Sequence, residues 1–312
     1  MVLSHGKKPL DQGTETRDPH LNGLIDCMFA GLPRQCGAFF LTGETNVLVD
    51  SGPSVTVDNV LRGIEASGVS PENLHYILLT HFHLDHAGGA SVLIKECPNA
   101  RVVVDARSAK YMADPSRLIG SAAKSLGDIA PHYGTMLPVP SERIIPLNDR
   151  YELDLGAGRS ITAVYTPGHS GGHYAFLLLP DRHLFCGDAL GHYIEEHDYI
   201  YPATPAPEFD LDKSLTSARR LLELEPEVIF FPHYGLSRDP VSIGKQFERQ
   251  VLRSVELVDA LDPEERVAGR LGALLFEDIP GVTDAEASLL RGILDVNAAG
   301  VLHYLAWRDS QG

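Results

Sequence analysis

The chain has 312 residues, of which 42 are acidic and 26 basic, so its formal net charge is −16. This balance disfavours a nucleic-acid backbone as the binding partner, although a small phosphoester is still compatible with it. The first eight residues lack an apolar stretch typical of a signal peptide, and no run of about 18 apolar residues occurs, so we expect a cytoplasmic protein without a membrane segment. Without CxxC spacing or a secretory context, the cysteines are expected to be free thiols: Cys27, Cys36, Cys97 and Cys186.

Short apolar segments alternate with helical patterns along the chain. In the first half we expect strands over 24–30, 38–41, 46–50 and 101–104, and helices over 57–66 and 88–96. In the second half we expect strands over 143–146, 160–165, 173–179, 183–186 and 228–231, and a helix over 211–224. Two β-rich halves with interspersed helices predict an α/β fold.

A histidine-rich segment directly follows the apolar residues 76–79. Within six residues it contains three imidazoles and a carboxylate, from His81, His83, Asp85 and His86. Ionisable side chains this close together repel one another or lose hydration unless a cation lies among them. The segment therefore predicts a metal-binding loop at the end of a strand.

Three more polar residues occupy equivalent places downstream. His169 follows the apolar segment 161–165, Asp188 follows 183–185, and His233 follows 228–231. Each residue alone is typical of a turn. Their order after the histidine-rich segment favours a shared role over three unrelated turns.

In this order the motifs resemble the metallo-β-lactamase-fold superfamily of metallohydrolases, particularly its glyoxalase II-like and lactonase-like branches. The resemblance covers residues 50–235 and implies a four-layer αβ/βα sandwich, with Asp50 bracing the metal loops. It implies a dinuclear centre with Asp188 as the bridge, a first metal on His81, His83 and His169, and a second on Asp85, His86 and His233.

Imidazole and carboxylate ligands without a thiolate suit zinc, and equally iron or manganese. Two divalent ions about 3.5–4 Å apart can share a water and lower its pKa, giving hydroxide at neutral pH. We therefore expect two ions, with Asp85 and Asp188 as the carboxylates of the catalytic centre, and attack on a small-molecule thioester, ester or lactone. An iron-dependent oxidoreductase such as a persulfide dioxygenase, and a phosphodiester or phosphotriester hydrolase, are the alternatives.

Two segments extend beyond a minimal core and supply candidate substrate contacts. Segment 112–142 contains several prolines and His132, in a second Pro-His-Tyr-Gly sequence that we do not expect to bind metal. Segment 191–209 begins three residues after Asp188 and contains His192 and Tyr193. The tyrosine that acyl-homoserine lactonases place after the bridging aspartate would fall on Gly191, so Tyr193 is displaced from that position.

Residues 237–312 are expected to form a C-terminal helical appendage to a catalytic domain of residues 1–236. Helix-start signals occur at 237–240, at Pro263 and at 283–286. The last helix carries a broad apolar stripe, which its own core, a homodimer interface or a pocket lid could cover. No motif carries over the glutathione-binding residues of glyoxalase II. The stripe consists of Leu290, Ile293, Leu294, Val301, Leu302, Leu305 and Trp307.

Overall fold

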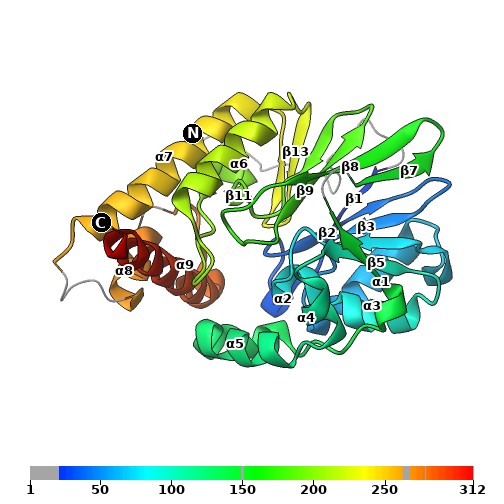
Figure 1. Ribbon diagram of the computed structural model, residues 1–312, viewed down its shortest axis with the longest axis horizontal. Coiled ribbons are helices and arrows are strands. Elements are labelled where there is room, and N and C mark those ends of the chain that lie inside the picture. The colour runs from blue at the N-terminus through cyan, green and yellow to red at the C-terminus, as the bar shows by residue number, and fades with distance from the viewer. Residues whose placement is uncertain (1–20, 149–150, 263–267, 278, 312) are drawn as a thin grey trace, which may run out of the picture.

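The computed structural model describes residues 21–148, 151–262, 268–277 and 279–311. Two six-stranded sheets lie face to face, and helices cover their outer faces (Figure 1). This arrangement confirms the four-layer α/β sandwich. No helix in the described ranges is long and apolar enough to cross a lipid bilayer.

The first sheet has the order β1-β2-β3-β4-β5-β6, antiparallel from β1 to β3 and parallel from β3 to β6. Its outer face carries α1 (Val57–Ala66), α3 (Ala90–Glu96) and α4 (Ala109–Ala113). The strands are β1 (Leu21–Asp26), β2 (Gly37–Leu41), β3 (Val47–Val49), β4 (Tyr76–Leu78), β5 (Arg101–Asp105) and β6 (Ile144–Leu147).

The second sheet has the order β14-β13-β10-β9-β8-β7 and is antiparallel except between β10 and β13. Helices α6 (Leu211–Glu223) and α7 (Pro240–Asp259) pack on it. The strands are β7 (Glu152–Gly156), β8 (Arg159–Tyr165), β9 (Tyr174–Leu179), β10 (His183–Phe185), β13 (Val228–Phe231) and β14 (Gly235–Ser237).

Aromatic side chains from both sheets form the central core. The rings of Phe39 and Phe185 lie 5.1 Å apart between centroids, and Phe185 stacks on Phe230 at 5.2 Å. All three side chains are buried. Burial of such large apolar surfaces fixes the two sheets against each other, so the loops at the strand ends start from a rigid base.

Several segments differ from the expectation. Strands β7 and β14 were not predicted, and the histidine-rich segment contains the short helix α2 (Leu84–Ala87). Segment 112–142 contains α5 (Ser116–Leu126) and the 3₁₀ helix η4 (Gly127–Tyr133), and segment 191–209 contains the hairpin β11 (His192–Ile194) and β12 (Tyr199–Tyr201). The other 3₁₀ turns are η1 (Phe29–Gly31), η2 (Ser54–Thr56), η3 (Pro71–Asn73), η5 (Ser141–Arg143) and η6 (Glu195–His197).

Two of the C-terminal helices, α7 and α9, begin where the sequence predicts. Asp239 caps α7 by accepting a hydrogen bond from the Ser242 amide at 2.9 Å, and the Glu286 carboxylate accepts one from the Thr283 amide at 3.0 Å at the start of α9 (Asp284–Ser310). Helix α8 (Ala268–Phe276) lies between them, and Pro263 is outside the described residues. The domain division at residue 236 stays a prediction.

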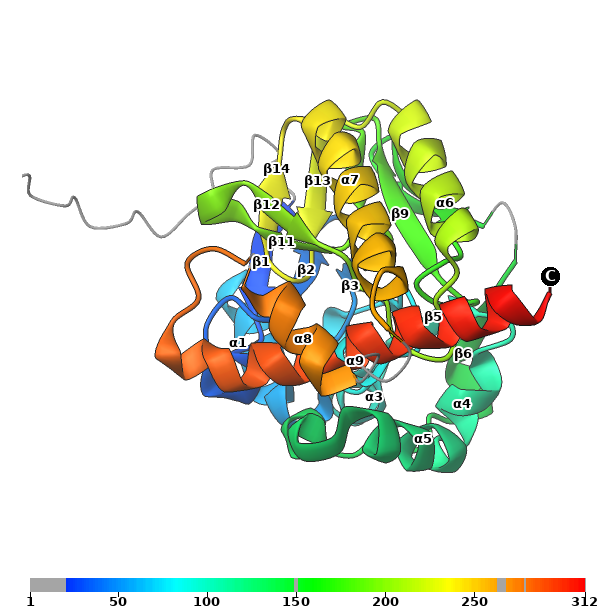
Figure 2. The ribbon, with the colours of Figure 1, turned by 90° about the vertical axis from the view of Figure 1, so that its left-hand side faces the viewer.

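Helix α9 crosses between α7 and α5 (Figure 2). The central part of its apolar stripe is buried within the chain, whereas Trp307 is half exposed. The chain's own core therefore covers most of the stripe. The buried members are Leu290, Leu294, Val301 and Leu305.

Candidate metal centre

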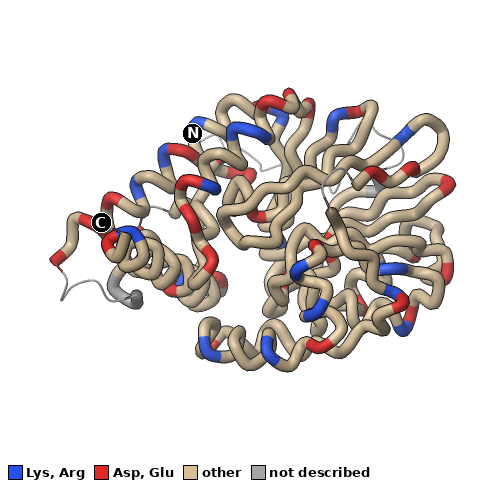
Figure 3. The backbone as a smooth tube through the Cα atoms, in the orientation of Figure 1, with Lys and Arg blue, Asp and Glu red and all other residues tan. Residues whose placement is uncertain are grey.

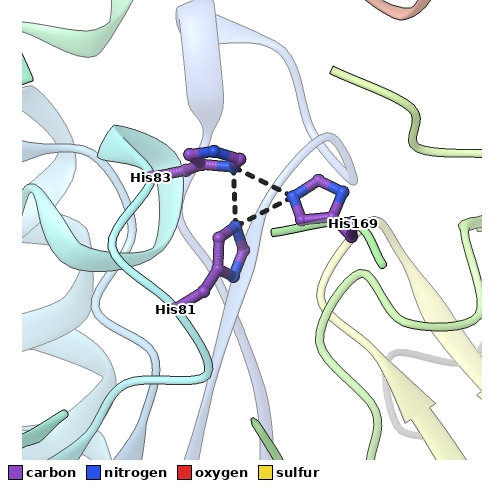
Figure 4. A group of neighbouring side chains, drawn as sticks. All are labelled: His81, His83 and His169. Atoms are coloured by element: carbon purple, nitrogen blue, oxygen red, sulfur yellow. Dashed lines mark hydrogen bonds between the residues drawn. The ribbon is translucent and has the colours of Figure 1, made fainter. Parts of the chain in front are cut away.

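Three histidines from both halves of the chain converge at the strand ends (Figure 4). His81 and His83 follow β4, and His169 follows β8. The Nε2 atom of His81 lies 2.8 Å from Nδ1 of His83 and 3.1 Å from Nε2 of His169, and the latter two nitrogens lie 2.9 Å apart. We refer to these residues as the first ligand group.

A second group lies beside the first and consists of Asp85, His86 and His233. The two imidazole Nε2 atoms are 3.1 Å apart, and the Asp85 Oδ2 atom lies 3.8 Å from the His86 nitrogen and 3.6 Å from that of His233. Asp85 and His86 lie on α2, and His233 follows β13. We refer to these residues as the second ligand group.

Asp188 lies between the two groups and faces each with a different oxygen. Its Oδ2 atom is 3.4 Å from Nε2 of His169, whereas its Oδ1 atom is 3.4 Å from Nε2 of His86. The Oδ1 atom is buried and has no hydrogen-bond partner among the described residues. A buried carboxylate oxygen without a partner is costly unless a cation binds it.

Hydrogen bonds on the far side of three rings fix which nitrogen carries the proton. The Nδ1 atom of His86 lies 2.9 Å from Oδ2 of Asp50, that of His169 lies 3.0 Å from the Ala203 carbonyl oxygen, and that of His233 lies 2.7 Å from the Gln35 carbonyl oxygen. Because these oxygens only accept, Nδ1 donates in each ring and Nε2 faces the centre, where its lone pair would bind a cation. Metal-binding histidines are held by such partners.

Asp50 directly follows β3 and connects the end of this strand to the histidine-rich segment. Its Oδ1 atom accepts hydrogen bonds from the Thr80 amide at 2.8 Å and hydroxyl at 3.0 Å, while its Oδ2 atom accepts from His86. The residue has a positive φ of 57°, a backbone conformation that aspartate tolerates better than most residues. The expected bracing role of Asp50 is thus confirmed.

Electrostatics favour neutral imidazoles at His169 and His233, whereas the carboxylates of Asp188, Asp50 and Asp85 outweigh burial and raise the pKa of His86 well above its usual range. Burial lowers the pKa of His169 and of His233 to about 4, so both rings are neutral at pH 7. Burial opposes ionisation of Asp188, yet the nearby His86, His169 and His233 outweigh it and hold the Asp188 pKa well below its usual range. Neutral nitrogen lone pairs and buried carboxylate oxygens are the donor set that a divalent cation requires. The residues present therefore fit two metal ions.

His173 is a functional neighbour that the sequence analysis did not single out. Its Nδ1 atom lies 2.7 Å from the Thr166 hydroxyl, and its Nε2 atom accepts a hydrogen bond from the Asp188 amide at 3.1 Å. The ring also lies beside His81, with centroids 5.0 Å apart. His173 therefore positions the Asp188 loop. Its signal in the sequence is the second histidine of the glycine-rich segment 168–173.

The predicted substrate residues lie in three different settings. His192 is buried, stacks on His233 at 4.1 Å, and places its Nε2 atom 3.5 Å from Asp188 Oδ2. Tyr193 donates a hydrogen bond to Asp198 at 3.0 Å and lines a second cavity of about 300 Å³, whose walls also include His233. His132 is exposed on η4, with its ring 6.3 Å from that of Phe29.

A cavity of about 390 Å³ opens onto the ligands. One part of its wall is the centre itself, with His83, Asp85, His169 and Asp188, and His192 lies beside them. The rest comes from segment 82–84, α4, α5, η4, the loop 203–208 and α9. Helix α9 of the C-terminal region thus contributes to the same cavity as the ligands.

Helix α9 also supports a first-group ligand through one buried side chain. The Asn297 Oδ1 atom accepts a hydrogen bond from the Thr204 amide at 2.9 Å, and its Nδ2 atom donates to the Pro202 carbonyl oxygen at 3.0 Å. Between these two residues lies Ala203, whose carbonyl oxygen accepts the Nδ1 proton of His169. Asn297 therefore fixes the short segment that orients a ligand.

Comparison with known proteins agrees with the fold and with this centre. The metallo-beta-lactamase superfamily matches residues 31–233, and the chain belongs to this superfamily. It is 31% identical over 252 residues to the metallo-beta-lactamase fold-containing protein ST1585 of Sulfurisphaera tokodaii, covering 79% of this chain and 88% of that protein. The crystal structure of ST1585 superposes with a TM-score of 0.65 at 28% identity and covers 86% of this chain and 93% of that one.

Two further relatives frame the comparison. A metallo-beta-lactamase family protein of Thermus thermophilus has the same fold, with a TM-score of 0.69 at 22% identity over 94% of this chain and 95% of that one. The thioesterase pkgB of Emericella nidulans is 30% identical over 155 residues, which are 48% of this chain and 34% of that protein. The superfamily is largely composed of hydrolytic enzymes.

Proposed function

We propose that the protein is a dinuclear metallohydrolase that cleaves an activated carbonyl, foremost a thioester or ester, of a small molecule. One observation carries the proposal: Asp188 lies between two complete ligand groups and turns a separate oxygen toward each. Two bound divalent ions, most simply zinc, would supply a water that ionises near neutral pH and a positive charge that polarises the carbonyl oxygen.

The chain's own residues hold this chemistry in place. The hydrogen bonds at Nδ1 of His86, His169 and His233 keep the Nε2 atoms directed inward, so the rings need not turn on binding. His192 packs against the Asp188 carboxylate and limits the directions in which it can turn. Burial raises the pKa of Tyr133, which lines the cavity, so its phenol stays protonated and can donate a hydrogen bond to a substrate oxygen.

The charge of the cavity supports a carbonyl substrate over a nucleotide-like phosphoester. Of the described residues in its lining, only Arg117 and Glu208 carry a charge besides the ligand carboxylates. Lys and Arg are dispersed along the chain and interleaved with Asp and Glu (Figure 3). A polyanionic substrate needs several cationic partners. The thioesterase name of one relative agrees with a thioester substrate.

A substrate panel with metal-loaded protein tests this function. We expect turnover of a thioester or ester at least ~10³-fold faster than that of bis(p-nitrophenyl) phosphate, and no dependence on dissolved oxygen. The lactone arm of the panel distinguishes lactonase activity. Oxygen consumption with a persulfide and iron-loaded protein, without thioester, ester or lactone hydrolysis, would contradict the proposal and favour a dioxygenase.

A further inference from the structure

We propose that the cavity beside the metal centre binds the acyl part of the substrate, and that this acyl group is uncharged and apolar, with a chain of medium length or an aromatic ring system. The inference rests on the proposed hydrolase function and adds the class of acyl group. It follows from what lines the cavity, from where the cavity ends, and from how its far wall is fixed.

Apolar side chains form most of the wall away from the ligands. Helix α5 and η4 contribute one side, and α9 contributes the facing side. Leu118 and Ile129 are buried in the hydrophobic core, whereas Ala122, Leu126 and Ile293 are only partly buried against it and keep apolar surface toward the cavity. Apolar surface left open next to a reaction centre is typical of a binding site. The apolar residues of this wall are Leu118, Ala122, Leu126, Ile129, Ile293 and Val296.

Away from the ligands the charged groups of the lining are few, and its other polar side chains are neutral: Tyr111, Ser121, Ser125, Tyr133 and Asn297. Arg117 and Glu208 are exposed, and Glu208 accepts a hydrogen bond from the Gly171 amide at 2.8 Å. Desolvation of a charged acyl group against this wall would cost several kcal/mol without a partner. An apolar acyl group gains free energy from the same contact, about 0.8 kcal/mol for each buried CH₂.

The end of the cavity at the metal centre defines which part of a thioester enters it. Asp85, His169 and Asp188 line this end. When the carbonyl carbon of a thioester is held there, either the acyl group or the thiol part of the substrate must extend into the cavity. Biological thiol carriers of acyl groups are polar, and an apolar wall selects against them. The acyl group therefore occupies the cavity, and the thiol part points toward solvent.

The far wall is fixed against the rest of the molecule. At Gly292, an added Cβ atom would lie 2.5 Å from the Ile129 side chain, so α9 approaches η4 as closely as a glycine permits. Asn297, five residues further along α9, is tied to the loop 202–204. Because α9 is held at both positions, the width of the cavity is fixed before a substrate binds. The cavity therefore discriminates acyl groups by size.

The test compares thioesters of one small thiol, N-acetylcysteamine, that carry acyl groups from acetyl to decanoyl. We expect kcat/KM of the metal-loaded enzyme to rise by up to about four-fold per methylene until the cavity is full, and at least ~10-fold overall from acetyl to octanoyl. The succinyl thioester, which resembles a short acyl chain with a terminal charge, should be at least ~10-fold poorer than butanoyl.

A matched pair of variants on one helix sharpens the test. Ala122→Trp fills the cavity from α5, whereas Ala123→Trp places the same ring on the exposed side of that helix. We expect Ala122→Trp to lower octanoyl turnover at least ~10-fold while acetyl turnover changes no more than a few-fold. Ala123→Trp should keep the parent profile. Metal content and circular dichroism confirm that both variants are folded and loaded.

Binding of 2-decanone, an apolar ketone that cannot be hydrolysed, is measured separately by calorimetry. Binding that Ala122→Trp abolishes and Ala123→Trp preserves supports the proposal. Thioester turnover that is independent of acyl length, with ketone binding equal in both variants, overturns the acyl assignment but leaves the hydrolase. No turnover of any acyl thioester, together with no ester or lactone hydrolysis in the substrate panel, overturns the hydrolase and the acyl assignment together.

Discussion

The loops that carry the ligands and the helices that close the cavity are built on different physical principles. Each ligand loop follows a buried strand and is held by hydrogen bonds between buried polar groups, as at Asp50 and His173. The wall of α5, η4 and α9 is held mainly by apolar packing, with Asn297 as a polar exception. Metal bonds tolerate only a few tenths of an ångström, whereas an apolar wall tolerates substitutions of similar volume. In the proposed function the first region would hold the metal ions and the second would select the substrate.

The largest effect is expected where the two ligand groups meet. Asp188→Ala removes the carboxylate that faces both groups, so we expect activity to fall at least ~10³-fold and metal content to fall to one ion or fewer. Elemental analysis and steady-state kinetics on the same preparation measure both quantities.

Cys186→Ala is the control for this loop. The Cys186 thiol is buried and donates only to carbonyl oxygens of Gly187 and Phe230, at 3.2 and 3.3 Å. We expect the activity of the Cys186→Ala variant to stay within a few-fold of that of the parent protein. A similar loss of metal in both variants would mean that the loop, rather than the carboxylate, holds the ions.

A second pair of variants separates a strand-end histidine from one on η4. His233→Ala removes a second-group nitrogen, so we expect one ion to be lost and activity to fall at least ~10²-fold. His132, in the other Pro-His-Tyr-Gly sequence, is exposed, and His132→Ala should keep both ions and alter KM at most. If His132→Ala loses an ion and His233→Ala does not, the assignment of the second group is reversed.

The connection between the two regions is tested at Asn297. Asn297→Ala leaves the Thr204 amide and the Pro202 carbonyl without their partner, which loosens the segment that orients His169. We expect affinity for one of the two ions to fall about 10–100-fold, because outer partners of metal-binding histidines have effects of this size.

The Co²⁺ absorption spectrum of the loaded protein reports this change directly. The control is Arg308→Ala, a substitution elsewhere on α9. It removes the ion pair between Arg308 and Asp259 and should leave the spectrum unchanged. Equal metal affinity in the two variants would show that Asn297 has only a packing role.

A smaller effect is expected in the pH dependence of stability. Burial lowers the pKa of His169 from 6.5 to about 4, so below about pH 6.5 the unfolded chain binds a proton that the folded, metal-free protein does not. The free energy of unfolding of metal-free protein should therefore fall as the pH is lowered from about 6.5 to 4. His169→Gln should reduce this slope by up to one proton. Urea unfolding of both proteins between pH 4 and 7 measures it, and equal slopes would contradict the burial effect.

The sequence shows the candidate ligands as polar residues after apolar strands, and the resemblance to the superfamily implies their division between two ions. His81 and His233 are examples, since the segments before them are uniformly apolar. The two-sheet fold follows from the same strands and from the resemblance. The sequence does not show hydrogen bonds between a side chain and a backbone group of a distant segment. His173 acts through the Asp188 amide, and Asn297 acts through the carbonyl of Ala203.

Segment 112–142 illustrates a second limit. Its prolines indicate an irregular excursion, yet Pro115 stands directly before α5, where its missing N–H costs nothing. The predicted cavity contact in this segment was His132, whereas the structure places the next residue, Tyr133, in the cavity wall. Which of two neighbours points inward depends on the helical phase of η4, and that phase is set by packing against Phe29 and α9.

The number of ions bound per chain tests the central claim most directly. Elemental analysis of the parent protein, His169→Ala and His233→Ala, each saturated with Zn²⁺ and desalted, should give two ions for the parent and one for each variant. The two variants should retain different ions, distinguishable by their Co²⁺ spectra. A parent that saturates at one ion, or variants that both keep two, would contradict a dinuclear centre bridged by Asp188.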